Sequence, residues 1–141
     1  MLLPDVNILV YAHREDSPLH KQSLEWLESL INSDEAFAMS ELVFSGFLRI
    51  VTHPKIFNPP STLEDALSFI SQIRNRPNCV IVSPQNRHWD IFIKLCVDAN
   101  AKGNLIPDAY HAALAIETGS TWITTDRDFS RFSGLRWSAP I

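Results

Sequence analysis

The sequence has few cysteines and no long apolar segment. Cys79 and Cys96 lie apart in apolar surroundings with no second pair of metal ligands nearby, so we expect two buried thiols and neither a disulfide nor a zinc site. No apolar run approaches the roughly 20 residues that span a bilayer. Residues 1–5 lack the basic start and the length of a signal peptide, so we expect a cytoplasmic protein with no membrane partner.

The chain also lacks linker runs, internal repeats and low-complexity tracts. Its 141 residues, 45% of them hydrophobic and 20% charged, suit one domain over 1–141 with a full core. The net charge of −4 argues against a protein that coats nucleic acid by bulk attraction. Residues 1–35 carry seven acids and two bases, whereas the remainder carries nine acids and ten bases. This imbalance leaves room for local basic patches, and the acidic first segment suits a basic partner.

Strand-like and helix-like patterns alternate along the sequence. Residues 1–10 predict a buried strand that runs into a loop, and further strands are expected at 36–38, 79–82, 121–125 and 135–137. Helices are expected at 17–33 with Ser17 as cap, 40–51 with Ser40 as cap, 63–73 with Ser61 and Glu64 as a capping box, 86–100 with Trp89, Phe92, Ile93 and Cys96 buried, and 105–119. The alternation predicts an α/β sandwich with a mainly parallel central sheet.

The segment 105–119 predicts a buried helix with a carboxylate at its start. Pro107 suits a first helical turn, and Gly119 suits the left-handed residue that closes a helix. Several alanines at spacings of three and four would let this helix lie close against a sheet. Asp108 falls in the first turn, where unpaired N–H groups favour negative charge. Such a place suits an ionised ligand for a metal, but an ordinary acid in a first helical turn has the same pattern. The positions of the other acids decide which of the two Asp108 is.

Four acids are expected at one edge of the sheet. Asp5 and Asp126 follow strands, whereas Glu41 and Asp108 open helices that leave the same edge. Clustered carboxylates repel one another and raise their own pKa values unless a cation binds between them. Mg²⁺ takes oxygen ligands and keeps several waters, which leaves room for phosphate oxygens and a nucleophilic water.

Four short motifs, in this order, resemble those of PIN domains: Asp5-Val6-Asn7-Ile8-Leu9-Val10-Tyr11-Ala12, Ser40-Glu41-Leu42, Ile106-Pro107-Asp108-Ala109 and Thr124-Thr125-Asp126-Arg127-Asp128-Phe129. The segments 45–54 and 129–132 resemble the VapC-type toxins of bacterial toxin–antitoxin pairs. The resemblance implies a PIN-like three-layer α/β/α sandwich. It places the catalytic, metal-binding acids at Asp5, Glu41, Asp108 and Asp126, with Asn7, Thr125 and Asp128 in supporting positions.

The same resemblance implies an endoribonuclease that depends on Mg²⁺, with Mn²⁺ as a possible substitute, and that cleaves RNA by a metal-activated water. It further implies inhibition by a VapB-type antitoxin and a homodimer, for which we expect the apolar residues around Trp26 and 44–47 to supply the surface. Two alternatives stay open: a catalytically silent RNA-binding PIN domain, and a metal-dependent phosphatase, although Asp5-x-Asn7 lacks the second Asp of a haloacid-dehalogenase nucleophile pair.

Other residues have plainer expectations. We expect the five histidines at the surface or at helix ends and the four tryptophans in the core or at interfaces. Four arginines are candidates for lining an RNA path: Arg14, Arg49, Arg127 and Arg131.

Overall fold

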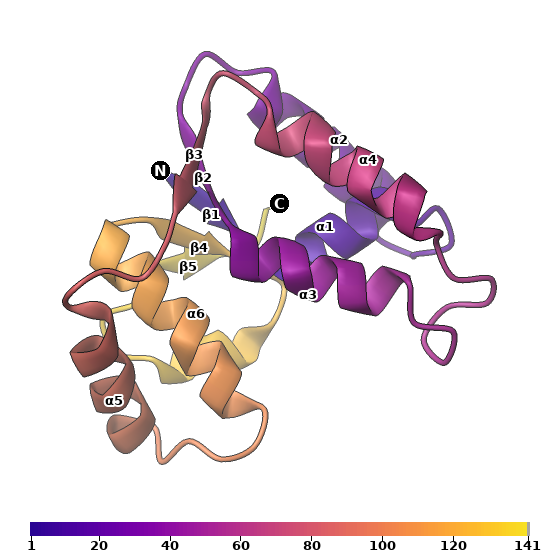
Figure 1. Ribbon diagram of the computed structural model, residues 1–141. Coiled ribbons are helices and arrows are strands. Elements are labelled where there is room, and N and C mark those ends of the chain that lie inside the picture. The colour runs from indigo at the N-terminus through magenta and orange to yellow at the C-terminus, as the bar shows by residue number, and fades with distance from the viewer. Residues whose placement is uncertain (141) are drawn as a thin grey trace.

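The computed structural model describes residues 1–140 and shows short strands alternating with helices (Figure 1). The strands are β1 (Leu2–Pro4), β2 (Phe37–Ser40), β3 (Cys79–Val82), β4 (Thr121–Ile123) and β5 (Trp137–Ser138). The α-helices are α1 (Val6–His13), α2 (His20–Ile31), α3 (Glu41–Val51), α4 (Leu63–Arg74), α5 (His88–Asp98) and α6 (Leu105–Thr118), and a short 3₁₀ helix, η1, covers Arg127–Arg131.

All strand pairs in the described residues are parallel. One sheet has the order β1-β4-β5, and a second sheet pairs β2 with β3. The two sheets meet where β1 lies beside β2. Helices α5 and α6 lie together on one side of the strands, while α1 to α4 form a separate group (Figure 1). The predicted α/β class with a parallel sheet is therefore confirmed.

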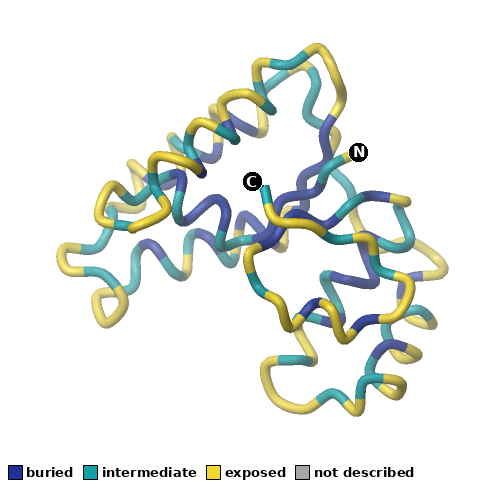
Figure 2. The backbone as a smooth tube through the Cα atoms, turned by 180° about the vertical axis from the view of Figure 1, so that it is seen from behind, coloured by how far each residue is buried: buried dark blue, intermediate teal, exposed yellow. Residues whose placement is uncertain are grey.

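The core is built from the strands and from the inner faces of the helices (Figure 2). Leu3, Phe37 and Trp122 on the strands are fully buried, as are Ala109, Ala112, Ala113 and Ala115 on α6. These alanines let α6 approach the strands closely, as expected. Gly119 ends α6 with φ of 66°, a left-handed conformation that glycine adopts without steric cost.

The first segment differs from its prediction. The strand β1 ends at Pro4, and a helix, α1, begins at Val6 where we expected strand and loop up to Val10. Ile8, Leu9, Val10 and Ala12 are all buried because α1 lies inside the fold. A short helix that is apolar on most sides has no amphipathic period, so its pattern cannot be distinguished from that of a buried strand.

Two predicted helix caps are wrong, and one is confirmed. Ser40 caps α3 by accepting from the Leu42 N–H. The cap of α4 is Thr62, which accepts from the Asp65 N–H, and not Ser61. Ser17 accepts from the Leu19 N–H in a turn before α2, which begins at His20 without a side-chain cap. A cap depends on the direction of the entering chain, which the sequence pattern does not specify.

Helix α5 exposes more apolar surface than its pattern indicated. Trp89 is 60% and Ile93 is 42% exposed, whereas we expected both to be buried; Phe92 and Cys96 are partly buried, and the buried residues of α5 are His88 and Leu95. The helix packs mainly on α6, so its other face stays open. Cys79 and Cys96 are free thiols, as expected, but each is only partly buried.

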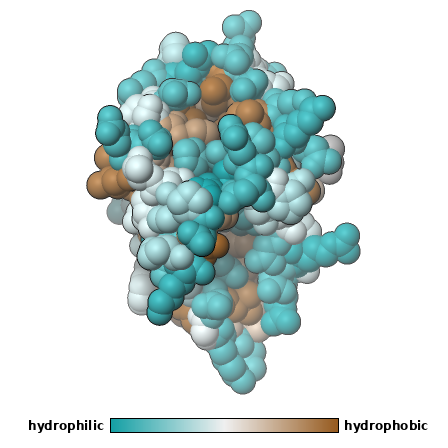
Figure 3. All heavy atoms as spheres, turned by 90° about the vertical axis from the view of Figure 1, so that its right-hand side faces the viewer, coloured by the Kyte–Doolittle hydropathy of each residue, from teal (hydrophilic) through white to brown (hydrophobic). Residues whose placement is uncertain are grey.

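The face of the molecule drawn in Figure 3 is mostly hydrophilic, with apolar side chains gathered in separate patches. Within residues 1–140 no helix combines the length and the apolar character needed to cross a membrane.

Candidate active site

Asp5 lies at the junction of β1 and α1. Its backbone N–H donates to the Ile123 carbonyl oxygen at 2.8 Å, which continues the pairing of β1 with β4. Its Oδ1 accepts from the Val6 N–H at 2.6 Å and so caps α1. The side chain is buried, with 8% of the residue exposed. The end of a strand and the start of a helix together fix the direction of this carboxylate.

Thr124 joins Asp5 to Asp126. Its hydroxyl donates to Asp5 Oδ2 at 2.7 Å and accepts from the Asp126 N–H at 3.0 Å. Asp126 Oδ1 in turn accepts from the Asp128 N–H at 2.9 Å, which caps η1. Sequence reasoning missed Thr124 and named Thr125, which is exposed. Alternation along the strand could not have identified it, because Trp122, Ile123 and Thr124 are all buried and β4 ends at Ile123.

Asp108 lies in the first turn of α6 and lines a cleft of about 750 Å³ together with Asp5 and Asp126. Burial raises the pKa of Asp5 to about 6, assisted by the charges of Asp108 and Asp126 and opposed by the hydrogen bonds from Thr124 and Val6. Burial and then the charges of Asp126 and Asp128 raise the pKa of Asp108 to about 6. The cleft thus holds carboxylates that destabilise one another when ionised.

Asn7 also lines the cleft, one residue beyond the start of α1. Its Nδ2 donates to Thr125 Oγ1 at 3.1 Å, which gives Thr125 a role in orienting the amide. Asn7 Oδ1 is buried and has no hydrogen-bond partner within residues 1–140. A buried acceptor without a donor is costly, so this oxygen is available to a cation or another donor.

Glu41 does not face the cleft with the other acids. It begins α3 as expected, but its carboxylate pairs with the Arg74 guanidinium of α4 at 3.0 Å, and its side chain is 67% exposed. Asp128 is exposed on η1, close enough to Asp108 to raise the pKa of that acid. In the part of the chain that the structure describes, no three His, Cys, Asp or Glu side chains converge into a complete metal site.

Two histidines are more buried than we expected. His88 is 2% exposed and donates from Nε2 to the Tyr110 carbonyl oxygen at 3.0 Å, although it does begin helix α5. His111 lines the cleft and stacks on Trp122, with ring centroids 5.2 Å apart. Burial lowers the pKa of His111 to about 4, so this imidazole is neutral at physiological pH.

The chain matches the PIN domain family model over residues 2–135. Ribonuclease VapC43 of Mycobacterium tuberculosis is 41% identical over 141 residues, covering 100% of this chain and 96% of the relative. Ribonuclease VapC25 of the same organism is 40% identical over 140 residues, covering 99% of each chain.

A solved structure, VapBC2 from Rickettsia felis bound to a DNA fragment from its promoter, contains a chain of the same fold. It has a TM-score of 0.70 at 20% identity, covering 98% of this chain and 97% of that chain. The family match and the identity with these relatives extend over nearly the whole chain. The chain therefore belongs to the PIN domain family, among the VapC ribonucleases.

Proposed function

We propose that this chain is the toxin of a toxin–antitoxin pair and that it hydrolyses RNA phosphodiester bonds. The observation that carries the proposal is the cleft that Asp5, Asp108 and Asp126 all line and in which two of the three have raised pKa values. Identity of about two residues in five with relatives named ribonucleases supports the same reaction class.

The residues of the cleft fit a divalent cation with a preference for oxygen, Mg²⁺ or Mn²⁺. The donors are carboxylates, together with the buried and unpartnered Asn7 Oδ1. Asp5, Asp108 and Asp126 would hold the cation. When bound, it would supply positive charge to offset that of the phosphate oxygens and would lower the pKa of a water. We propose Glu41 as a further ligand, which requires its carboxylate to leave Arg74.

The chain's own residues prepare this cleft. Thr124 orients Asp5 and Asp126 through one hydroxyl, and Thr125 orients Asn7. Asp128 fixes Asp126 through its backbone N–H. These contacts hold the acids in place before substrate arrives, so less reorganisation is needed during the reaction.

Arginines around the cleft support RNA as the substrate. Arg49 lines the cleft, and Arg127 and Arg131 lie on η1 directly after Asp126. Within residues 1–140 none of these three side chains makes a hydrogen bond or ion pair to the protein, whereas four of the five guanidinium N–H groups of the other candidate, Arg14, donate to the protein. Unpaired cations beside an acidic centre are suited to contacts with backbone phosphates on either side of the cleaved bond.

Incubation of the purified protein with a 5′-labelled RNA, with Mg²⁺, with Mn²⁺ or with EDTA, tests the activity. We expect fragments with either metal and none with EDTA. Asp126→Asn should remove cleavage, whereas Asp34→Asn, the same change at an exposed turn, should not. Cleavage that persists in EDTA would refute the metal-dependent mechanism, and RNA binding without cleavage by the wild-type protein would favour a silent RNA-binding domain.

The partner we propose is a VapB-type antitoxin with a basic tail. The cleft acids and the acidic segment 1–35 favour such a tail, and an Arg from it would occupy the place of the cation. Co-expression with the product of the adjacent small gene should suppress cleavage. Replacement of the tail's Arg should restore some activity, and complete inhibition without that Arg would show that other contacts block the cleft.

We also propose a homodimer. Of the surface that the sequence indicated, Phe44 and Phe47 are buried in the core of the same chain and offer nothing to a second copy, whereas Trp26 is only partly buried. Exposed apolar side chains one turn apart on α5, Trp89, Ile93 and Val97, are better suited to one. Light scattering should return a dimer mass, Val97→Glu should return a monomer, and the neighbouring Lys94→Glu should not.

A further inference from the structure

The loop between α3 and α4, residues 52–62, forms one wall of the acid-lined cleft. Ile56 and Phe57 line the same cavity as Asp5, Asp108 and Asp126. No residue of this loop is buried, and Ile56 is 50% exposed. Phe57 is partly buried and packs against the core, whereas Ile56 does not, so burial of apolar surface holds only part of the wall. Other contacts must hold the rest.

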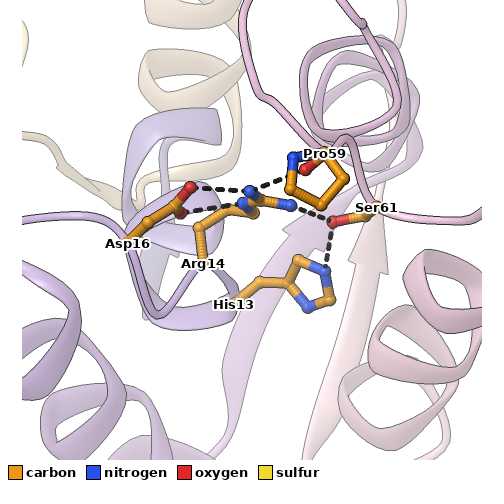
Figure 4. A network of polar contacts seen from close by, with 5 residues as sticks. All are labelled: His13, Arg14, Asp16, Pro59 and Ser61. Atoms are coloured by element: carbon orange, nitrogen blue, oxygen red, sulfur yellow. Dashed lines mark hydrogen bonds and ion pairs between the residues drawn. The ribbon is translucent and has the colours of Figure 1, made fainter.

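Arg14, which follows the last residue of α1, makes contacts with three parts of this loop. Its guanidinium donates to Ser61 Oγ at 3.1 Å and to the Pro59 carbonyl oxygen at 3.0 Å (Figure 4). The guanidinium carbon lies 4.3 Å from the centroid of the Phe57 ring, in a cation–π contact. One side chain thus reaches the loop along much of its length.

Asp16 holds the guanidinium in the plane that these contacts need. It accepts from Arg14 Nε at 2.9 Å and from Nη2 at 2.7 Å, a bidentate pair (Figure 4). The Arg14 side chain is 12% exposed. Four of the five guanidinium N–H groups are used within the protein, so Arg14 has little capacity left to bind RNA.

Ser61 closes the loop from the other side. Its N–H donates to the Val51 carbonyl oxygen at 2.8 Å, and its hydroxyl lies 3.0 Å from His13 Nε2. His13 in turn packs on the rings of Phe47 and Phe69. Asp5 therefore lies at the start of helix α1, and His13 and Arg14, which contact the loop, lie at its end.

We propose that Arg14 is a positioning residue, which holds the Ile56–Phe57 wall at a fixed place relative to the acids and so determines which RNA strands are cleaved. This inference rests on the proposed ribonuclease activity. Asp5 precedes the first residue of α1 and Arg14 follows its last residue, so this helix fixes the place of the wall relative to the acids. Without Arg14 the loop keeps the contacts of Ser61 with Val51 and His13, but it loses those to Pro59 and Phe57, so we expect the wall to move away from the acids.

The loop contains a natural probe of its own position, because exposed Lys55 directly precedes Ile56. We expect trypsin to cut the native wild-type protein slowly after Lys55 and to cut Arg14→Lys and Ser61→Ala about tenfold faster, the effect of losing one charge-assisted hydrogen bond. Cutting after exposed Lys102 should not change. Lys94→Gln, which removes an ion pair with Asp98 on α5, serves as the matched control.

Kinetics on RNA separate positioning from general stability. With Arg14→Lys we expect KM for a folded RNA to rise and cuts to spread to additional sites, while kcat on a short unstructured RNA changes little. Phe57→Ala should give the same redistribution, because it removes the wall itself. A residue needed only for stability would lower Tm and reduce activity on both RNAs alike.

Each outcome decides between these possibilities. Unchanged trypsin cutting after Lys55 in Arg14→Lys and Ser61→Ala would show that Arg14 does not hold the loop through Ser61. Faster cutting with unchanged KM and cut sites would overturn the positioning role. If Arg14→Lys does not fold, Ser61→Ala provides both readouts. If the wild-type protein cleaves no RNA, the proposed function fails, yet the trypsin experiment still shows whether Arg14 holds the loop in place.

Discussion

Replacement of Asp108 by Asn should stabilise the metal-free protein while abolishing its activity. Asp108 is partly buried and faces other carboxylates, and its pKa is raised from 3.8 to about 6. A folded-state pKa above the unfolded value means that the ionised group destabilises the fold. The full shift corresponds to about 3 kcal/mol at neutral pH, and screening at this partly exposed site reduces it to roughly 1–2 kcal/mol.

The sign of the effect fixes its pH dependence. Between pH 3.8 and about 6 the folded wild-type protein binds more protons at Asp108 than the unfolded chain does. The wild-type protein therefore loses stability at this site as pH rises through that window, and Asp108→Asn does not. The advantage of the variant should be full above pH 7 and absent near pH 4.

Thermal unfolding in EDTA at pH 7.5 and at pH 4 measures this difference. We expect Asp108→Asn to raise Tm at pH 7.5 by roughly 3–7 °C. Addition of Mg²⁺ or Mn²⁺ should reverse the order, because the wild-type site binds the ion better. A variant that unfolds at the same or a lower temperature than the wild-type protein in EDTA, or a gain that does not depend on pH, would refute the repulsion argument.

Three further predictions concern the same cleft. Saturating Mg²⁺ or Mn²⁺ should stabilise the wild-type protein by about 3 kcal/mol at a hundred times the Kd, and differential scanning fluorimetry with and without metal checks this. Thr124→Val should cost about 1–3 kcal/mol in urea unfolding, raise the pKa of Asp5 further and slow RNA cleavage, because Asp5 and the Asp126 N–H both lose a partner; unchanged cleavage would show that Thr124 does not orient the acids. Burial lowers the pKa of His111 from 6.5 to about 4 in the folded protein. Between these two pH values the unfolded chain binds a proton at His111 and the folded protein does not, so the wild-type protein loses stability as pH falls from 6.5 to 4. His111→Phe should not show this loss, and its gain over the wild-type protein should grow by up to about 3 kcal/mol across that window; parallel pH curves for the two proteins would contradict the prediction.

Sequence pattern was sufficient for features that depend on near neighbours in the chain. The left-handed Gly119, the Ser40 cap and the alanine face of α6 each involve residues within about four positions of one another. Asp5, Asp108 and Asp126 could be assigned to one edge because each follows a strand or opens a helix, and parallel strands end at a common edge. These features follow from local geometry and the general rules of α/β folds.

The tertiary structure decided which partners the side chains meet. Thr124 and Asp5 are 119 positions apart, and Arg14 reaches Ser61 across 47 positions, so no local pattern reports either contact. Glu41 begins its helix as predicted, yet its carboxylate turns to Arg74 because α4 packs beside α3. Helix α1 is enclosed by the fold, so it is apolar on most of its faces, and its sequence resembles that of a buried strand. Periodicity records which faces of an element are apolar, whereas the direction of each polar side chain depends on the neighbours that folding brings to it.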